Sequence, residues 1–236
     1  MGFHRGPKVV TNGLVLALDA GNTKSYPGSG TTWTDKSGFG KNGTLVNGPI
    51  FNSANGGSIV TDGTNDYVDC GASFNYTSEA FTMSYWFYFN TFTTNRVDGN
   101  STNPVLFSNG GSTTRGYYAQ VIGADGSVIF VTSQSGAAQS TQTVGALSIQ
   151  KWIKIDITRS GSSVVIYING INKNLTSGTH INPVSSNYNL TLSYYNDNNY
   201  IVAANMRSSQ FQIYNRALTA QEIQQNYNAT KSRYGL

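Results

Sequence analysis

The sequence predicts an all-β fold, a sandwich or jelly roll of antiparallel strands, and three observations lead to this prediction. Charged residues make up only 11% of the 236 positions, whereas aromatic residues reach 12%. Apolar segments of strand length recur about every 8–12 residues, which is the spacing of strands in sandwiches and barrels. The segments between them are rich in glycine, asparagine and serine, and helical signals are confined to the C-terminal end.

The composition also excludes several classes of protein. A net charge of only +4 and the many aromatic residues argue against a disordered chain. No apolar run approaches the roughly 18 residues that a membrane span needs, so we expect no membrane association. The two ends are basic and the middle is acidic, without a long run of like charges, so we expect no nucleic-acid binding. The N-terminus lacks a secretory leader, which predicts synthesis in a cytoplasm.

The chain divides into an arm, one domain and a short tail. Residues 1–12 are polar and contain glycine and proline, and we expect them to form an N-terminal arm. The domain spans residues 13–216 and begins with a strand at Gly13–Asp19, which reads L-V-L-A-L-D after its glycine. Residues 20–58 are dense in turn signals such as Y-P-G-S-G and K-N-G. We expect residues 217–236 to form a C-terminal helix and tail.

The longest predicted strand is Ala80–Phe89, which carries aromatic side chains on both faces and should therefore be central. Trp152–Thr158 alternates isoleucine with polar residues, and Asn169-Gly170 favours a type I′ hairpin turn after the next strand. Residues 90–103 and 133–146 are polar and are expected to form a loop and a link. The other expected strands are 58–61, 67–70, 105–108, 116–122, 127–132, 164–168, 190–194, 200–203 and 210–214.

Two local patterns are specific enough to place side chains. In D-Y-V-D-C-G, strand alternation puts Tyr67 and Asp69 on one face and Val68 and Cys70 on the other. Near the end of the chain, T-A-Q-E is a capping box, in which Thr219 and Glu222 satisfy backbone groups of the first helical turn.

The ordered series of motifs resembles a known superfamily. It comprises L-V-L-A-L-D (14–19), W-T-D-K-S-G-F-G-K-N-G (33–43), G-G-S-I-V-T-D-G-T-N-D-Y-V (56–68), F-T-M-S-Y-W-F (81–87), K-W-I-K-I-D-I-T-R (151–159), V-I-Y-I-N-G (165–170) and Q-I-Y-N-R-A-L-T-A-Q-E-I (212–223). Together they resemble the laminin-G-like domains of the concanavalin A-like lectin/glucanase superfamily. The resemblance implies a jelly-roll β-sandwich of two antiparallel sheets, with a short C-terminal helix.

A narrower resemblance concerns the two ends. The opening G-F-H-R-G-P-K-V-V-T-N-G and the closing I-Q-Q-N-Y-N-A-T-K-S-R-Y-G-L are similar to structural proteins of tailed bacteriophages. This resemblance implies a non-enzymatic virion protein, a capsid decoration or surface appendage that stabilises the particle or mediates weak adhesion. It also implies a place on the virion surface after synthesis in the host cytoplasm. The implied partners are other virion proteins, such as the major capsid protein or appendage proteins, and further copies of the chain in a homo-oligomer.

An alternative function stays open beside the virion role. The chain could be a lectin-like phage tail adhesin that binds host polysaccharide and depends on calcium. In the virion hypothesis, the basic and aromatic residues at the ends are the anchors to the particle, although they could equally be frayed termini. These predicted anchors are Phe3, Arg5, Lys8, Lys231 and Arg233.

We predict no catalytic residues, although the superfamily includes glucanases. Retaining glycosidases need two carboxyl groups about 5 Å apart, and the glucanases present them on one strand in a pattern like E-x-D-x-x-E. This chain has only two glutamates, Glu79 before a strand and Glu222 in the capping box. His4 and His180 lie in polar segments without a nucleophile motif.

Calcium is the one metal that the residues suggest. Hard cations prefer several oxygen ligands from loops, and many laminin-G-like domains bind calcium near such loops. Asp35 and Asn42 lie in one candidate loop, and Asp62 and Asp66 lie in another. The alternative is that these side chains cap turns through hydrogen bonds to the backbone.

Aromatic rings are the candidates for carbohydrate binding, because an exposed ring can stack on the face of a sugar. The rings considered are Tyr117, Tyr118, Tyr194, Tyr195, Tyr200 and Trp33. Of these we select Trp33, Tyr118, Tyr195 and Tyr200 as predicted binding residues. Consecutive tyrosines on a strand point to opposite faces, so about half of the rings should belong to the core.

Overall fold

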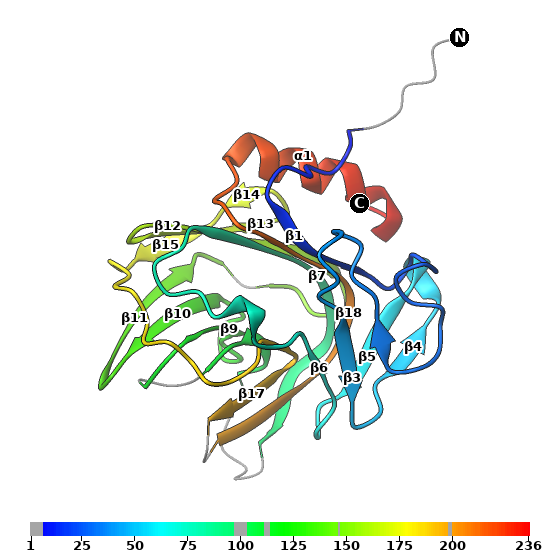
Figure 1. The fold of residues 1–236 in the computed structure, drawn as a ribbon, viewed down its shortest axis with the longest axis horizontal. Helices are drawn as coiled ribbons and strands as arrows, with labels where there is room; N and C mark the ends of the chain where they lie inside the picture. Colours follow the sequence, from blue (N-terminus) through cyan, green and yellow to red (C-terminus); the bar gives the residue numbers. More distant parts are fainter. Residues whose placement is uncertain (1–6, 97–102, 111–113, 146, 198–199) are drawn as a thin grey trace.

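Two antiparallel sheets packed face to face form the body of the protein, as the sequence predicted (Figure 1). The structure is a computed structural model that describes residues 7–96, 103–110, 114–145, 147–197 and 200–236; for 93–96, 177, 196–197 and 200–201 it describes the backbone alone. Among the described residues, no helix is long and apolar enough to span a bilayer.

Sheet A contains nine strands in the order β14-β13-β12-β7-β18-β5-β4, with β1 and β17 also paired to β18. Its strands are β1 (Leu14–Asp19), β4 (Ile50–Asn52), β5 (Ser58–Asp62), β7 (Phe81–Arg96), β12 (Trp152–Ser160), β13 (Ser163–Ile168), β14 (Ile171–Asn172), β17 (Tyr194–Asp197) and β18 (Tyr200–Tyr214). The long strands β7 and β18 lie side by side at its centre, as expected for a segment with aromatic residues on both faces.

Sheet B contains nine strands in the order β15-β11-β10-β9-β8-β16-β6-β3-β2. Its strands are β2 (Thr32–Trp33), β3 (Gly43–Val46), β6 (Tyr67–Asp69), β8 (Val105–Ser108), β9 (Tyr117–Val121), β10 (Val128–Gln134), β11 (Ala137–Thr143), β15 (Asn174–Ser177) and β16 (Thr191–Leu192). In the described parts of the chain, three short 3-10 helices lie in the connections: η1 (Ala54–Gly56), η2 (Ala72–Phe74) and η3 (Lys231–Tyr234).

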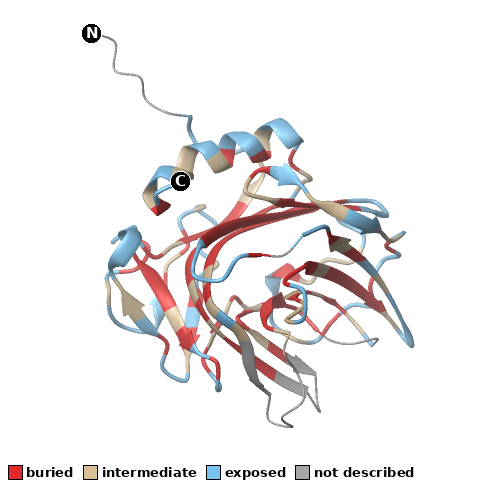
Figure 2. Cartoon of the chain, turned by 180° about the vertical axis from the view of Figure 1, so that it is seen from behind, coloured by how far each residue is buried: buried red, intermediate tan, exposed pale blue. Residues whose placement is uncertain are grey.

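The main core lies between the sheets and follows the alternation of each strand. In β12, the side chains of Ile155 and Ile157 are fully buried, and in register these residues pair with Tyr85 and Met83 of β7. Figure 2 shows the strands buried over most of their length, whereas much of the surface of the C-terminal helix is exposed. Burial of this apolar area is the main favourable term in folding.

Some strands differ from the sequence predictions. The polar segment 133–146 was expected to be a link, but Ala137–Thr143 forms β11, which pairs along its length with β10. Similarly, the two short strands expected in 200–214 are one continuous strand, β18. Backbone pairing to neighbouring strands stabilises both segments, and this tertiary contribution leaves little trace in local hydrophobicity.

A single α-helix, α1 (Ala220–Thr230), lies across the outer face of sheet A among the described residues. The predicted capping box is confirmed: the Thr219 hydroxyl accepts from the Glu222 backbone N–H, and the Glu222 carboxylate accepts from the Thr219 N–H. Leu218 and Ile223 are buried against Tyr214 of β18. The helix therefore buries the outer face of the sheet and leaves its own polar face to solvent.

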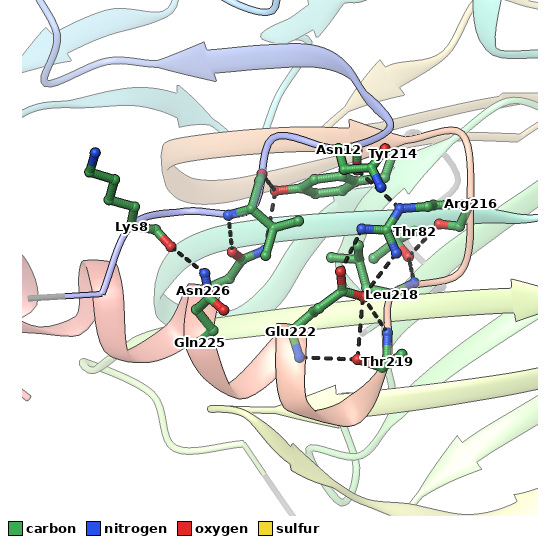
Figure 3. Close-up of polar contacts among 11 residues, drawn as sticks. Lys8, Asn12, Thr82, Tyr214, Arg216, Leu218, Thr219, Glu222, Gln225 and Asn226 are labelled. Atoms are coloured by element: carbon green, nitrogen blue, oxygen red, sulfur yellow. Dashed lines mark hydrogen bonds and ion pairs between the residues drawn. The ribbon is translucent and has the colours of Figure 1, made fainter.

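The N-terminal segment is hydrogen-bonded to α1 (Figure 3). The Val10 N–H donates to the Asn226 side chain at 2.8 Å, and the Gln225 side chain donates to the Lys8 carbonyl at 2.7 Å. The Tyr214 hydroxyl donates to the Val10 carbonyl at 3.0 Å. Residues from Lys8 onward thus belong to the folded body. The part of the expected arm (residues 1–12) that begins at Lys8 is therefore packed on the domain.

His180 is expected to make stability depend on pH. Its buried ring bridges the hydroxyls of Thr132 and Thr141, each at 2.8 Å, and burial, aided by the charge of Arg159, lowers its pKa from 6.5 to about 4. The unfolded chain therefore binds a proton more readily than the folded one. The contribution of His180 to the free energy of unfolding should be fully present above about pH 6.5. It should fall by ~3 kcal/mol as the pH drops towards 4.

Urea unfolding at a series of pH values checks this prediction, with His180→Asn as the comparison, because carboxyl groups also titrate near pH 4. The wild-type protein should lose more stability than the variant between pH 7 and pH 4.5. Parallel curves for the two proteins would contradict the assignment of this pH dependence to His180.

Candidate functional site

A pocket of about 280 Å³ opens where the chain passes from sheet B to sheet A. The lining residues combine three tyrosine rings with carboxylate, amide and hydroxyl groups. They are Tyr67, Asp69, Ser108, Asn187, Tyr188, Asn189, Thr191 and Tyr194. We refer to it as the tyrosine pocket.

Strand alternation places the floor of the tyrosine pocket on the outer face of sheet B. In β6, Val68 points into the core and is fully buried, so Tyr67 and Asp69 point outward. The short strand β16 lies between β6 and β8, and its Thr191 pairs in register with both Asp69 and Ser108. Three polar side chains therefore lie in a row across three neighbouring strands.

Hydroxyl groups of that row hold the chain at the crossing between the sheets. Ser193 adopts a positive φ of 64° between β16 and β17. The carbonyl of Tyr194 accepts hydrogen bonds from the Thr191 hydroxyl at 2.8 Å and the Ser108 hydroxyl at 3.1 Å. As a result, the Tyr194 ring stacks on the Tyr67 ring, with centroids 4.5 Å apart and planes 16° apart.

Asp69 and Asn189 form the polar part of the tyrosine pocket. The Asp69 carboxylate accepts from the Gly71 backbone N–H at 2.7 Å and from the Asn189 amide at 2.9 Å. These contacts fix the carboxylate, and each oxygen keeps a lone pair for a further donor. On the rim, the Arg115 guanidinium donates to the Asn187 side chain at 2.8 Å.

The hydroxyls of Tyr67 and Tyr194 remain protonated hydrogen-bond donors at neutral pH. Burial and the nearby Asp69 charge raise the pKa of Tyr67, and burial together with Tyr67 raises the pKa of Tyr194. Neither hydroxyl bonds to another residue in the described part of the chain. The pocket thus offers stacked rings, a carboxylate, amides and two unengaged phenol groups to a polyhydroxylated ligand.

The predicted sugar-binding rings have different outcomes. The prediction for Trp33 is wrong, because its side chain is fully buried in the core and cannot stack on a ligand. Tyr118 and Tyr195 contact each other edge to face, with ring centroids 5.3 Å apart, and neither belongs to the residues that line the tyrosine pocket. Tyr195 is itself mostly buried. The side chain of Tyr200 lies outside the described residues.

The predicted calcium loops are organised by hydrogen bonds. The Asp35 carboxylate accepts from the backbone N–H groups of Ala17, Ser37 and Lys41, and the Asn42 side chain accepts from the Asp35 N–H. These bonds match the turn-capping alternative.

The second loop is similar, since the Asp62 carboxylate accepts from Thr64 N–H and Asp66 from the Asp62 N–H. Over the described ranges, no group of three His, Cys, Asp or Glu side chains is placed so that it could hold a metal ion. Calcium binding stays a prediction.

The predicted virion anchors lie at both ends of the chain. Phe3 and Arg5 lie outside the described residues, and Lys8 is exposed. Arg233 forms an ion pair with Asp19 at 2.7 Å and donates to the carbonyls of Asn55 and Gly56, so its guanidinium holds the tail to the body and is not a free anchor. Lys231 lies over the Tyr227 ring at 5.4 Å.

Comparison with known families agrees with the fold. A family model described as the concanavalin A-like lectin/glucanases superfamily matches residues 62–224, which is more than half of the chain. The chain belongs to this superfamily. The match includes every residue that lines the tyrosine pocket. No curated protein sequence matches the chain significantly.

Solved structures with a similar fold are binding domains of bacterial toxins. The binding domain of Paraclostridial Mosquitocidal Protein 1 has a TM-score of 0.69 and 19% identity, over 93% of this chain and 52% of that one. The ligand binding domain of botulinum neurotoxin serotype D, in complex with N-acetylneuraminic acid, has a TM-score of 0.67 and 15% identity, over 92% and 51%.

A third structure concerns the entry of botulinum neurotoxin type C into cells, which its title describes as dependent on two ganglioside molecules. It has a TM-score of 0.65 and 17% identity, over 93% of this chain and 52% of that one. This chain spans about half the length of all three, and at these identities the likeness shows the fold alone.

Proposed function

We propose that this protein is a non-enzymatic carbohydrate-binding domain that holds a sugar in the tyrosine pocket. The observation that carries the proposal is the stacked pair Tyr67–Tyr194 beside the fixed carboxylate and amide of Asp69 and Asn189. The sequence motifs favour a virion structural role, whereas the pocket supports the glycan-binding alternative.

The chemistry of a sugar matches these groups. A pyranose has a C–H-rich face that packs on an aromatic ring, and it has hydroxyl groups at its edge. Adjacent hydroxyls can donate to the Asp69 carboxylate and accept from the Asn187 amide or a tyrosine hydroxyl. Small-ligand sites commonly combine an apolar surface with a few fixed polar groups in this way.

The comparisons give indirect support. The superfamily is named for lectins as well as glucanases, and the titles of two structural neighbours name N-acetylneuraminic acid and ganglioside molecules as ligands of those toxins. A place on a bacteriophage virion, the virion partners and a homo-oligomer stay predictions from the sequence.

Loss of binding in a tyrosine variant tests the proposal. The protein is screened on a glycan array, and its best ligand is titrated by calorimetry into the wild type, Tyr67→Ala and Phe39→Ala. Phe39 is 62% exposed and lies away from the pocket lining, so it controls for nonspecific aromatic contact. We expect Tyr67→Ala to weaken binding about tenfold or more, a loss of ~1.4 kcal/mol.

Phe39→Ala should bind as the wild type does. Both variants must first show the wild-type melting transition, so that a folding defect is not mistaken for a binding defect. A Tyr67→Ala protein that is folded and binds the glycan with unchanged affinity would rule out the tyrosine pocket as the site.

A further inference from the structure

We infer that the tyrosine pocket selects uncharged sugars and disfavours acidic ones, an inference that rests on the proposed function. The inference concerns the class of ligand. One structural neighbour, a toxin domain, is in complex with N-acetylneuraminic acid, which is an acidic sugar. The charges that line this pocket favour the opposite preference.

Among the described residues that line the pocket, Asp69 is the only one with a charged side chain. Both of its oxygens already accept a hydrogen bond, from Gly71 and from Asn189. A carboxylate has acceptors only, so it can take donated hydrogen bonds from sugar hydroxyls but can form none with the carboxylate of an acidic sugar. Two carboxylates in one partly enclosed site also repel each other.

The surrounding groups add to this preference. The faces of the Tyr67 and Tyr194 rings are electron-rich, which favours neutral or positive groups over an anion. Burial raises the pKa of the Tyr67 hydroxyl, and the nearby charge of Asp69 adds to this rise. The described lining contains no lysine or arginine that could balance the negative charge of an anionic ligand.

Within the part of the chain that the structure describes, Arg115 is a cation that contacts the lining, through its hydrogen bond to the Asn187 side chain. Asn187 is exposed, so this guanidinium lies at the rim, whereas Asp69 is partly buried on the floor. An anionic group would have to reach this rim position to find a partner. Arg115 therefore provides the sharpest internal control for the inference.

A matched pair of ligands tests the preference. Neutral hexose oligosaccharides are compared with the corresponding uronic acid oligosaccharides, which differ only by oxidation at C6, by calorimetry at low and moderate salt. We expect the best neutral ligand to bind at least tenfold more tightly than its acidic counterpart. Asp69→Asn, which keeps the shape and an acceptor for Gly71, should shrink this ratio towards one, and Arg115→Gln should leave it unchanged.

Two results would overturn the inference. The first is that acidic ligands bind as tightly as neutral ones, or more tightly, while Tyr67→Ala still abolishes binding. This result would leave the proposed function intact. The other is acidic binding that Arg115→Gln selectively removes. If neither series binds the wild-type protein at all, the proposed function fails together with the inference.

Discussion

Replacing Asp156 with alanine is expected to lower the free energy of unfolding by about 3–5 kcal/mol. Asp156 and Lys154 form an ion pair on the outer face of β12, and both side chains are almost completely buried. The Lys154 ammonium also donates to the Ser84 hydroxyl at 2.7 Å. Removing the carboxylate leaves a buried ammonium group with a single neutral partner, and that desolvated charge is the main cost.

The matched comparison is the double variant Lys154→Met/Asp156→Leu. Replacing both members of a buried pair by apolar residues is often neutral or stabilising, so the double variant should be more stable than Asp156→Ala. Urea unfolding of both proteins gives the two free energies. A loss below about 1 kcal/mol in Asp156→Ala, or a double variant less stable than the single one, would contradict this account of the pair.

The pH dependence provides a second signature of the same pair. Burial lowers the pKa of Lys154, and the charge of Asp156 partly opposes that shift. Without Asp156 the pKa of Lys154 falls further below its unfolded value. The pKa of Lys154 is then lower in the folded state than in the unfolded state, so stability is lost as the pH falls. The difference in stability between Asp156→Ala and the wild type should therefore become smaller at high pH.

Replacing Tyr234 with alanine is the second large effect, with an expected loss of about 3–5 kcal/mol. The Tyr234 ring packs between two tryptophans, at 4.1 Å from the Trp86 centroid and 4.9 Å from that of Trp152. Its hydroxyl donates to the Ser209 hydroxyl at 3.0 Å. Without this ring, the tail loses its main contact with the outer face of sheet A.

The conservative variant Tyr234→Phe separates packing from hydrogen bonding. It keeps the ring between the tryptophans and should cost only about 1 kcal/mol. Thermal unfolding gives the stabilities, and tryptophan fluorescence should shift to the red in Tyr234→Ala alone, because Trp86 and Trp152 become exposed to water. Equal destabilisation by the two variants, or unchanged fluorescence, would show that the ring packing is not what holds the tail.

Much of the fold follows from local pattern in the sequence. Strand β12 was expected at Trp152–Thr158 and spans Trp152–Ser160, because its isoleucines alternate without interruption. Asn169 and Gly170 both have positive φ, as the hairpin prediction required. The polar strand β11 was missed, because its stability comes from pairing with β10 and not from an apolar face of its own.

The site was predictable only in part. Alternation in β6 correctly placed Tyr67 and Asp69 on one face, but nothing local indicated that a loop and β17 would bring Asn189 and Tyr194 to the same place. That proximity depends on the pairing of β16 with both β6 and β8, which is a long-range property of the fold. Trp33 was misplaced for a related reason: a two-residue strand is too short to show which face is buried.

The most direct test of glycan binding in the tyrosine pocket is a map of backbone amide shifts on an isotope-labelled protein titrated with a neutral oligosaccharide. We predict that the perturbed amides cluster at residues 67–71 and 187–194, which surround the pocket. A second cavity, of about 370 Å³, is lined by Lys151, Trp152 and Lys173 among others and serves as an internal reference. Perturbations centred on that second cavity, or none at saturating ligand, would contradict the assignment of this pocket as the sugar site.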